Sequence, residues 1–192
     1  MKTMKIVIVF ALALGIVSCN KEKNEPVVIK QRQTVLDSIQ RDFTETISNG
    51  SPGAYAVGYS FKTTSKGVIN QLALSTPSIG VYKIYIINTI TNAKDSVTVN
   101  ITAADTGKTI FNGITPLVTN ANDIVRISFN DLDKPQYQYL RVAGMKQTYG
   151  DIVLNGYAFQ AQATSSIINY ALSYGSSNDY TFGGVGFTFE KD

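Results

Sequence analysis

The sequence predicts an all-β fold, an antiparallel β-sandwich of jelly-roll or immunoglobulin-like topology with about nine or ten strands. From Ala54 to the C-terminus, short runs of β-branched and aromatic residues recur at intervals of about 10–15 residues. Residues that favour turns, mainly Gly, Asn, Asp and Pro, separate these runs. No long amphipathic pattern of helical period interrupts them, which argues against a parallel sheet with crossover helices.

A short helix is predicted ahead of the first run. Val35, Ile39 and Phe43 recur at helical spacing, and a turn cluster follows at residues 49–53. The threonines that come directly after Phe43 are poor residues for a helix interior. We therefore expect the helix to cover residues 34–42, with an edge strand as the alternative.

Nine segments after residue 54 are predicted to be strands, because branched and aromatic side chains alternate or run together between turns. They are residues 55–61, 68–74, 81–88, 96–101, 108–114, 123–129, 137–142, 152–160 and 180–190. The segment 81–88 shows the pattern most clearly, and residues 91–95 form the predicted hairpin turn that follows it.

The first and last of these strands share a sequence pattern. Residues 56–61 read AVGYSF and residues 184–189 read GVGFTF, each with a glycine between a valine and an aromatic residue. A glycine inside a strand often marks a bulge or the close approach of another part of the chain. The favoured interpretation is that the two strands occupy similar sheet environments, with a side-by-side position as one form of it; duplicated halves are the alternative.

The N-terminus has the order of a secretory signal. Lys2 and Lys5 precede twelve apolar residues, 6–17, and the run ends in Ile16-Val17-Ser18-Cys19, which resembles a bacterial lipobox. Twelve residues are too few for a bilayer core, which needs about 20. We expect lipoprotein processing with lipidation of Cys19, the alternatives being a plain signal peptide or a retained anchor.

This signal divides the chain into three parts. Residues 1–18 are the signal peptide, residues 19–34 the lipidated cysteine and a polar tether, and residues 35–192 a single β-sandwich domain. The expected location is the cell envelope, lipid-anchored at the outer membrane, with exposure at the cell surface as one option. Loss of the signal leaves 15 basic and 14 acidic residues, a net charge of +1.

Composition excludes several function classes. The chain has no histidine, so catalysis through histidine and zinc sites with imidazole ligands are excluded. Its one cysteine is the predicted lipid site, so neither a thiol mechanism nor an internal disulfide is expected. The absence of a basic stripe argues against nucleic acid as a partner. We expect no cofactor.

The carboxylates do not predict an enzyme. Four of the eight aspartates after residue 54 stand directly beside Asn or Gly, where Asp is favoured for turn formation. A glycan-processing enzyme with two opposed carboxylates is therefore the least favoured function. Asp131 and Asp133 are candidate calcium ligands, but a turn ahead of Lys134-Pro135 is the preferred interpretation.

Tyrosines give the best indication of a binding surface. Seven of the eleven lie between Tyr137 and Tyr180. Their rings suit stacking against sugars, and nearby amides can bind hydroxyl groups. The candidate ligand-binding residues are Tyr149, Tyr170, Tyr174, Asn178, Asp179 and Tyr180. The alternative is burial on sheet faces, with Tyr137 and Tyr139 lining the core.

Three strand patterns and a turn also resemble a known family. VGYSF at 57–61, GVINQL at 67–72, GVYKIYI at 80–86 and ITPL at 114–117 are similar to a bacterial extracellular β-sandwich family of unknown function. The resemblance covers residues 55–130, and a tryptophan common in the family is replaced at Ile86 or its neighbour. It implies a Bacteroidetes-type surface lipoprotein, of a kind found beside carbohydrate-related modules, and supplies no catalytic residues.

Together these features predict a lipid-anchored, non-catalytic binding or adhesion module of the cell envelope. Its partners would be the membrane, through the lipid, and a glycan or another surface protein. The alternative is a structural or assembly subunit that pairs with another chain through an exposed strand edge.

Overall fold

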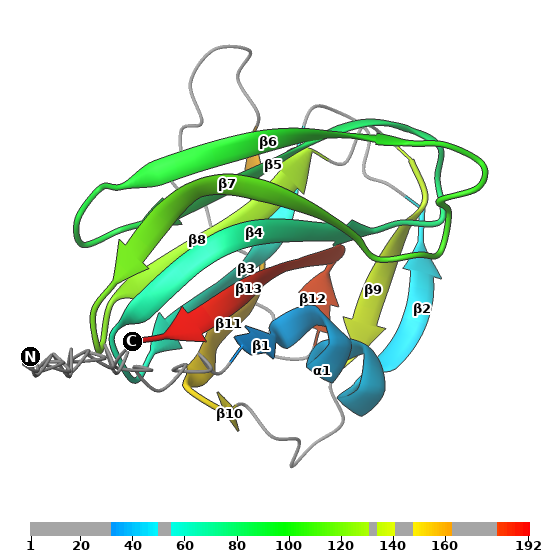
Figure 1. Ribbon diagram of the computed structural model, residues 1–192. Coiled ribbons are helices and arrows are strands. Elements are labelled where there is room, and N and C mark those ends of the chain that lie inside the picture. Colours follow the sequence, from blue (N-terminus) through cyan, green and yellow to red (C-terminus); the bar gives the residue numbers. More distant parts are fainter. Residues whose placement is uncertain (1–31, 50–54, 131–133, 141–147, 163–179) are drawn as a thin grey trace, which may run out of the picture.

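The computed structural model describes residues 32–49, 55–130, 134–140, 148–162 and 180–192, which form thirteen strands and one helix (Figure 1). All strand pairs among these residues are antiparallel. This confirms the predicted all-β sandwich class.

Two larger sheets and one smaller sheet make up the fold. The four-stranded sheet has the order β1 (Arg32–Thr34), β13 (Gly184–Lys191), β4 (Gly67–Ser75) and β7 (Ile110–Thr119). The six-stranded sheet has the order β10 (Thr148–Tyr149), β11 (Ile152–Gln162), β3 (Tyr55–Thr63), β8 (Ile124–Asn130), β5 (Gly80–Asn88) and β6 (Lys94–Ile101). The small sheet has the order β12 (Tyr180–Phe182), β9 (Gln136–Leu140) and β2 (Thr44–Ser48).

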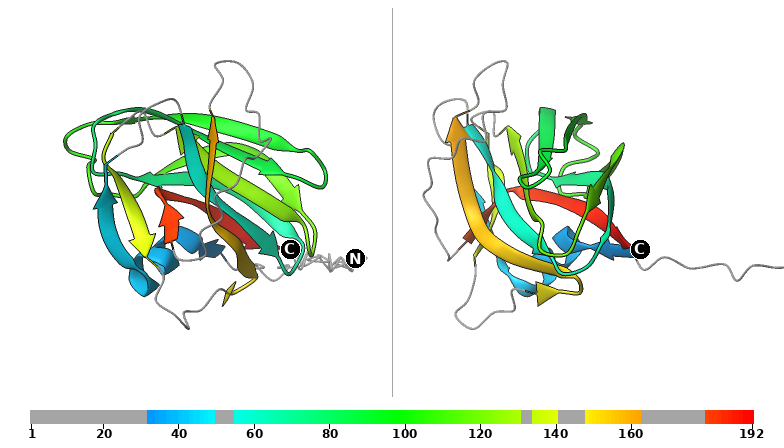
Figure 2. Two further views of the ribbon diagram at one scale, coloured as in Figure 1. Left: turned by 180° about the vertical axis from the view of Figure 1, so that it is seen from behind. Right: turned by 90° about the vertical axis from the view of Figure 1, so that its left-hand side faces the viewer.

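The core lies between the two larger sheets. Phe61 of β3 stacks on Phe187 of β13, with ring centroids 4.1 Å apart and an interplanar angle of 14°. The right-hand view of Figure 2 shows β3 and β11 together in one layer and β13 in the other. Side chains from both larger sheets are buried in this core, and each large apolar side chain among them stabilises the fold by about 1.5–3 kcal/mol.

The helix α1 (Val35–Asp42) covers one side of β13 and agrees with the prediction of a helix over residues 34–42. Its apolar residues Val35, Leu36 and Ile39 are buried. Leu36 lies directly over Gly186, where a Cβ atom would be 2.4 Å from the Leu36 Cβ. The glycine therefore allows the helix to sit against the strand.

The two strands with the shared pattern lie in different sheets. β3 belongs to the six-stranded sheet and β13 to the four-stranded sheet, so they face each other across the core and are not side by side. The expected close approach is present at both glycines. A Cβ atom at Gly58 would lie 2.0 Å from the Ile127 carbonyl oxygen, as one at Gly186 would meet Leu36.

The strand count exceeds the predicted nine or ten for two reasons. The single strand predicted at 180–190 is divided at Gly183, which has φ +71° and donates its N–H to the Tyr137 carbonyl oxygen at 2.8 Å. In addition, β1, β2 and β10 are short strands that were not predicted. β1 lies within the segment 19–34 that was expected to be tether.

Strand register places several turns at one end of the sandwich, which we call the Arg32 end. Arg32 is paired with Glu190, and Lys191 with Gly67. The turns at this end are residues 64–66, 89–93, 120–123 and 150–151, as the pairs Lys62–Ile124, Asn88–Val125, Gly67–Thr119 and Tyr149–Ile152 require. The loops 76–79 and 102–109 lie at the opposite end (Figure 1).

Candidate functional site

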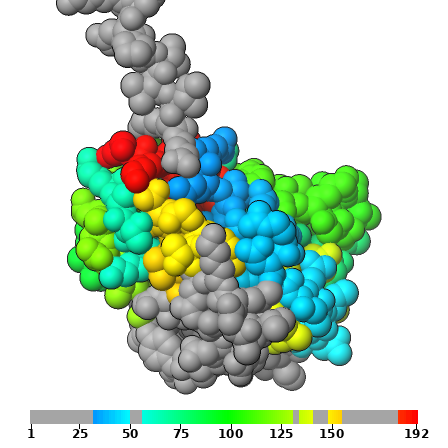
Figure 3. Space-filling model, turned by 90° about the horizontal axis from the view of Figure 1, so that it is seen from below, coloured from blue at the N-terminus to red at the C-terminus, as the bar shows by residue number. Residues whose placement is uncertain are grey.

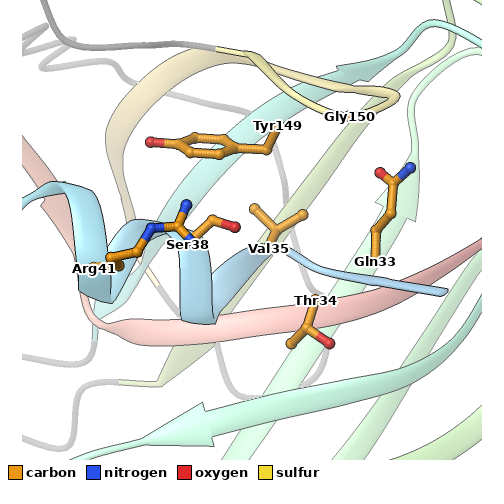
Figure 4. Close-up of a pocket in the computed structure, with 7 residues that line it drawn as sticks. All are labelled: Gln33, Thr34, Val35, Ser38, Arg41, Tyr149 and Gly150. Atoms are coloured by element: carbon orange, nitrogen blue, oxygen red, sulfur yellow. The ribbon is translucent and has the colours of Figure 1, made fainter.

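An open pocket of about 260 Å³ lies between α1 and the β10–β11 hairpin. Its lining residues come from β1, the exposed side of α1 and the hairpin turn, and are Gln33, Thr34, Val35, Ser38, Arg41, Tyr149 and Gly150 (Figure 4). In Figure 3, β1 and α1 (blue) lie beside the hairpin (yellow) on this face of the molecule. Segments more than 100 residues apart in the sequence thus meet at one site.

The helix presents the polar side of the pocket. Ser38 and Arg41 are three residues apart, so they lie on the same face of α1, while Val35 and Ile39 turn toward the core. Arg41 Nε donates to Asp42 Oδ1 at 2.8 Å, and this hydrogen bond raises the pKa of the guanidinium further above its ordinary value. Arg41 thus remains a cation at every physiological pH.

The hairpin turn forms the opposite wall. Gly150 has φ +58° at the first position of a two-residue turn, a conformation for which glycine is the favoured residue. Gln33 holds this turn to β1: its Nε2 donates to Asp151 Oδ2 at 3.0 Å, and the Asp151 N–H donates to Gln33 Oε1 at 3.1 Å. Two reciprocal hydrogen bonds therefore hold the hairpin turn against β1.

Lys191 adds a charge to the same cluster. Its Nζ donates to Asp151 Oδ1 at 3.0 Å, and this hydrogen bond is the main cause that lowers the pKa of Asp151 below its ordinary value. The C-terminal strand, the hairpin turn and β1 are therefore joined through one carboxylate.

Tyr149 is the one predicted ligand-binding residue whose side chain the structure describes. Its ring forms a wall of the pocket and is only 6% exposed (Figure 4). A ring so covered is not an open stacking platform. The pocket thus combines a cation, a hydroxyl group and an aromatic ring, a set of groups that can hold a small polar ligand.

Of the other predicted ligand-binding residues, the structure describes only the backbone of Tyr180. Tyr180 begins β12 of the small sheet, opposite Leu140, whereas Tyr149 belongs to the six-stranded sheet. The remaining predicted site residues lie outside the described residues: Cys19, Asp131, Asp133, Tyr170, Tyr174, Asn178 and Asp179. Tyr139 is buried and Tyr137 packs against the core, with ring centroids 6.3 Å apart, which confirms that this pair lines the core.

The sequence did not predict Gln33, Ser38 or Arg41 as site residues. The spacing of Ser38 and Arg41 opposite the apolar stripe indicates an exposed polar helix face. That pattern does not predict which exposed helix face lies against another segment. The segment opposite Ser38 and Arg41 is a hairpin turn more than 100 residues later in the chain.

Two of the described aspartates, Asp95 in β6 and Asp105 in a turn, accept backbone N–H groups. Asp95 Oδ2 accepts the Thr115 N–H at 2.8 Å, and Asp105 accepts the Thr102 N–H at 3.0 Å. In the part of the chain that the structure describes, no three His, Cys, Asp or Glu side chains gather so that they could hold a metal ion. Likewise, no helix in the described ranges is long and apolar enough to cross a membrane.

The outer strand β7 is poorly suited to pairing with another chain. It bulges between Gly113 and Leu117, where three residues of β7 lie opposite one residue of β4, and Pro116 within the bulge has no N–H to donate. The Thr115 N–H is taken by Asp95 of the neighbouring β6. The bulge, the proline and the occupied N–H are features that protect a sheet edge against pairing with an added strand.

No protein-family model matches the chain, and no curated protein sequence is significantly similar to it.

Proposed function

We propose that this protein is a lipid-anchored, non-catalytic binding module of the cell envelope. The observation that carries the proposal is the N-terminal series of Lys2, Lys5, an apolar run and Ile16-Val17-Ser18-Cys19. A polar stretch follows it, and then an all-β domain whose strands resemble those of Bacteroidetes-type surface lipoproteins. Two or more acyl chains on Cys19 would hold such a domain stably at a membrane.

The pocket supports a small polar ligand, and we propose a carbohydrate. Its 260 Å³ is below the range of about 300–1,000 Å³ that drug-sized ligands occupy, so it suits one sugar unit. Ser38 and Arg41 supply hydrogen-bond donors, and Tyr149 supplies an aromatic ring. Gln33 is already bound to Asp151 and acts as a support for the wall.

Fractionation of cells tests the anchor. The wild-type chain should be found in the membrane fraction and incorporate a labelled fatty acid. The Cys19→Ala variant should incorporate none and should keep its signal peptide. A wild-type chain that takes up no label contradicts the anchor.

A glycan array tests the ligand. The full chain in detergent should bind at least one glycan, and Arg41→Ala should weaken that binding by about tenfold or more because it removes a charged donor. Lys108→Ala, an exposed residue at the opposite end of the sandwich, is the matched control and should bind as the wild type does. Absence of any bound glycan, or equal binding by Arg41→Ala, contradicts a sugar site here. Binding that depends on Tyr174 and not on Arg41 would place the ligand in segment 163–179.

One observation favours the alternative function, assembly through a strand edge. β2 is the outer strand of the small sheet, and its Ile47 side chain is 61% exposed. If β2 pairs with a second chain, the protein should form oligomers whose fraction rises with concentration in sedimentation, and Ile47→Lys should abolish them. A monomer at all concentrations rules out self-assembly by this strand.

A further inference from the structure

The β5–β6 turn presents an apolar side chain at the Arg32 end. Ile90 lies in this turn with 64% of its surface exposed, among exposed Thr91, Asn92 and Ala93. Lys94, which follows at the start of β6, is also exposed. An exposed isoleucine in the turn and a lysine at its end are suited to the boundary between lipid headgroups and acyl chains.

Buried hydrogen bonds hold this turn in place. Asn88 Oδ1 accepts the Ile90 and Thr91 N–H groups at 3.0 and 3.2 Å, and Asn88 Nδ2 donates to Asp123 Oδ2 at 2.6 Å. Asn88 and Asp123 are both buried. The backbone at Ile90 is thus linked through Asn88 to Asp123 of the β7–β8 turn. These hydrogen bonds hold the turn in the conformation that exposes the Ile90 side chain.

The chain before the domain leads to the same end. Twelve residues separate Cys19 from Arg32, and a fully extended chain of that length spans at most about 45 Å. Arg32 pairs with Glu190 at the Arg32 end, beside Lys66 and Lys191. A lipid on Cys19 would therefore keep this end close to the bilayer, at a high effective concentration of lipid headgroups.

Charge at this end is compatible with an anionic bilayer. Lys66 and Lys191 are exposed but form ion pairs with Asp192 and Asp151, at 2.7 and 3.0 Å. Lys94 is the basic residue closest along the chain to Ile90, only four positions away. Ile90 and Lys94 are accordingly the apolar and the basic side chain that this hairpin offers for a lipid contact.

We infer that the Arg32 end is a membrane-facing surface, with Ile90 inserted at the headgroup boundary and Lys94 against the phosphate of anionic lipids. The inference rests on the proposed acylation of Cys19. It fixes the orientation of the domain: the loops 76–79 and 102–109 project away from the bilayer.

Tryptophan fluorescence tests this orientation, because the chain has no tryptophan of its own. Ile90→Trp puts the only indole at the proposed contact. Ile79→Trp is the matched control, an isoleucine of similar exposure (56%) at the opposite end. Each full-length, acylated variant is reconstituted into vesicles of phosphatidylethanolamine and phosphatidylglycerol that contain brominated phosphatidylcholine. Quenching at position 90 should exceed that at position 79 by at least about twofold, with a blue-shifted emission.

Two further variants make the result decisive. Thr91→Trp, in the same turn, should also be quenched, and adding Lys94→Glu to Ile90→Trp should reduce the quenching. Equal quenching at positions 90 and 79, in protein that floats with the vesicles, overturns the orientation and leaves the lipid anchor intact. Protein that carries no acyl chain and does not float contradicts the anchor itself, and with it the membrane-facing surface.

Discussion

At the scale of single residues, Tyr59 shows how burial shapes the core. Its side chain is fully buried on β3, and burial raises the pKa of its hydroxyl group far above the ordinary value. Within the described part of the chain, this hydroxyl has no hydrogen-bond partner. Burying an unsatisfied hydroxyl costs about 1–3 kcal/mol, which the ring offsets by its apolar contacts.

Tyr59→Phe should consequently leave the free energy of unfolding unchanged or raise it by up to about 1 kcal/mol. The comparison is Tyr139→Phe, because the Tyr139 hydroxyl accepts a hydrogen bond from Gln40 Nε2 at 3.3 Å. That variant should lose about 0.5–1.5 kcal/mol. Denaturant unfolding measures both, and a clear loss of stability in Tyr59→Phe would show that its hydroxyl is satisfied in the folded protein.

Asp151 makes stability depend on pH. Its pKa is lowered in the folded state, chiefly by the hydrogen bond from Lys191. A group of this kind stabilises the fold above its unfolded pKa of about 3.9, and the contribution is lost as the pH falls toward the folded value. Asp151→Asn should lower the melting temperature at pH 7 and flatten its decline below about pH 4. Wild-type and Asp151→Asn curves that fall in parallel below pH 4 would contradict this role.

At the scale of elements, the docking of α1 on β13 depends on a residue without a side chain. Gly186→Ala would place a Cβ atom 2.4 Å from the Leu36 Cβ, so the helix must shift away from the strand. We expect a loss of about 1–3 kcal/mol in the free energy of unfolding. Gly113→Ala on β7 is the control, since a Cβ atom there meets nothing within 4 Å, and it should change stability by no more than about 0.5 kcal/mol. Equal effects would show that the helix contact is not tight.

The elements that could be predicted are those whose pattern is complete within their own residues. α1 follows from the spacing of Val35, Ile39 and Phe43, and β5 from its run of branched and aromatic side chains. β1 and β10 have only three and two residues, too few to show a period, and exist through pairing with β13 and β11. The pocket escaped prediction for the same reason, because the Gln33–Asp151 contact joins residues 118 positions apart.

At the scale of the whole molecule, the two ends of the sandwich have different roles in the proposed function. The Arg32 end receives the chain from the predicted lipid and bears Ile90. Tyr149 lies at the same end through its pairing with Ile152, so the proposed ligand pocket also lies at the membrane-facing end. β11 then runs to Gln162, which pairs with Tyr55 near the opposite end. The predicted binding residues Tyr149 and Tyr180 are therefore separated along the chain by a strand that runs the length of the sheet.

Mass spectrometry of the N-terminal peptide from membrane-purified protein tests the central claim most directly. The account predicts a mature chain that begins at Cys19 and carries a diacylglyceryl group on its sulfur. A chain that retains Met1, or one cut elsewhere with Cys19 unmodified, would contradict the lipid anchor and the orientation built on it.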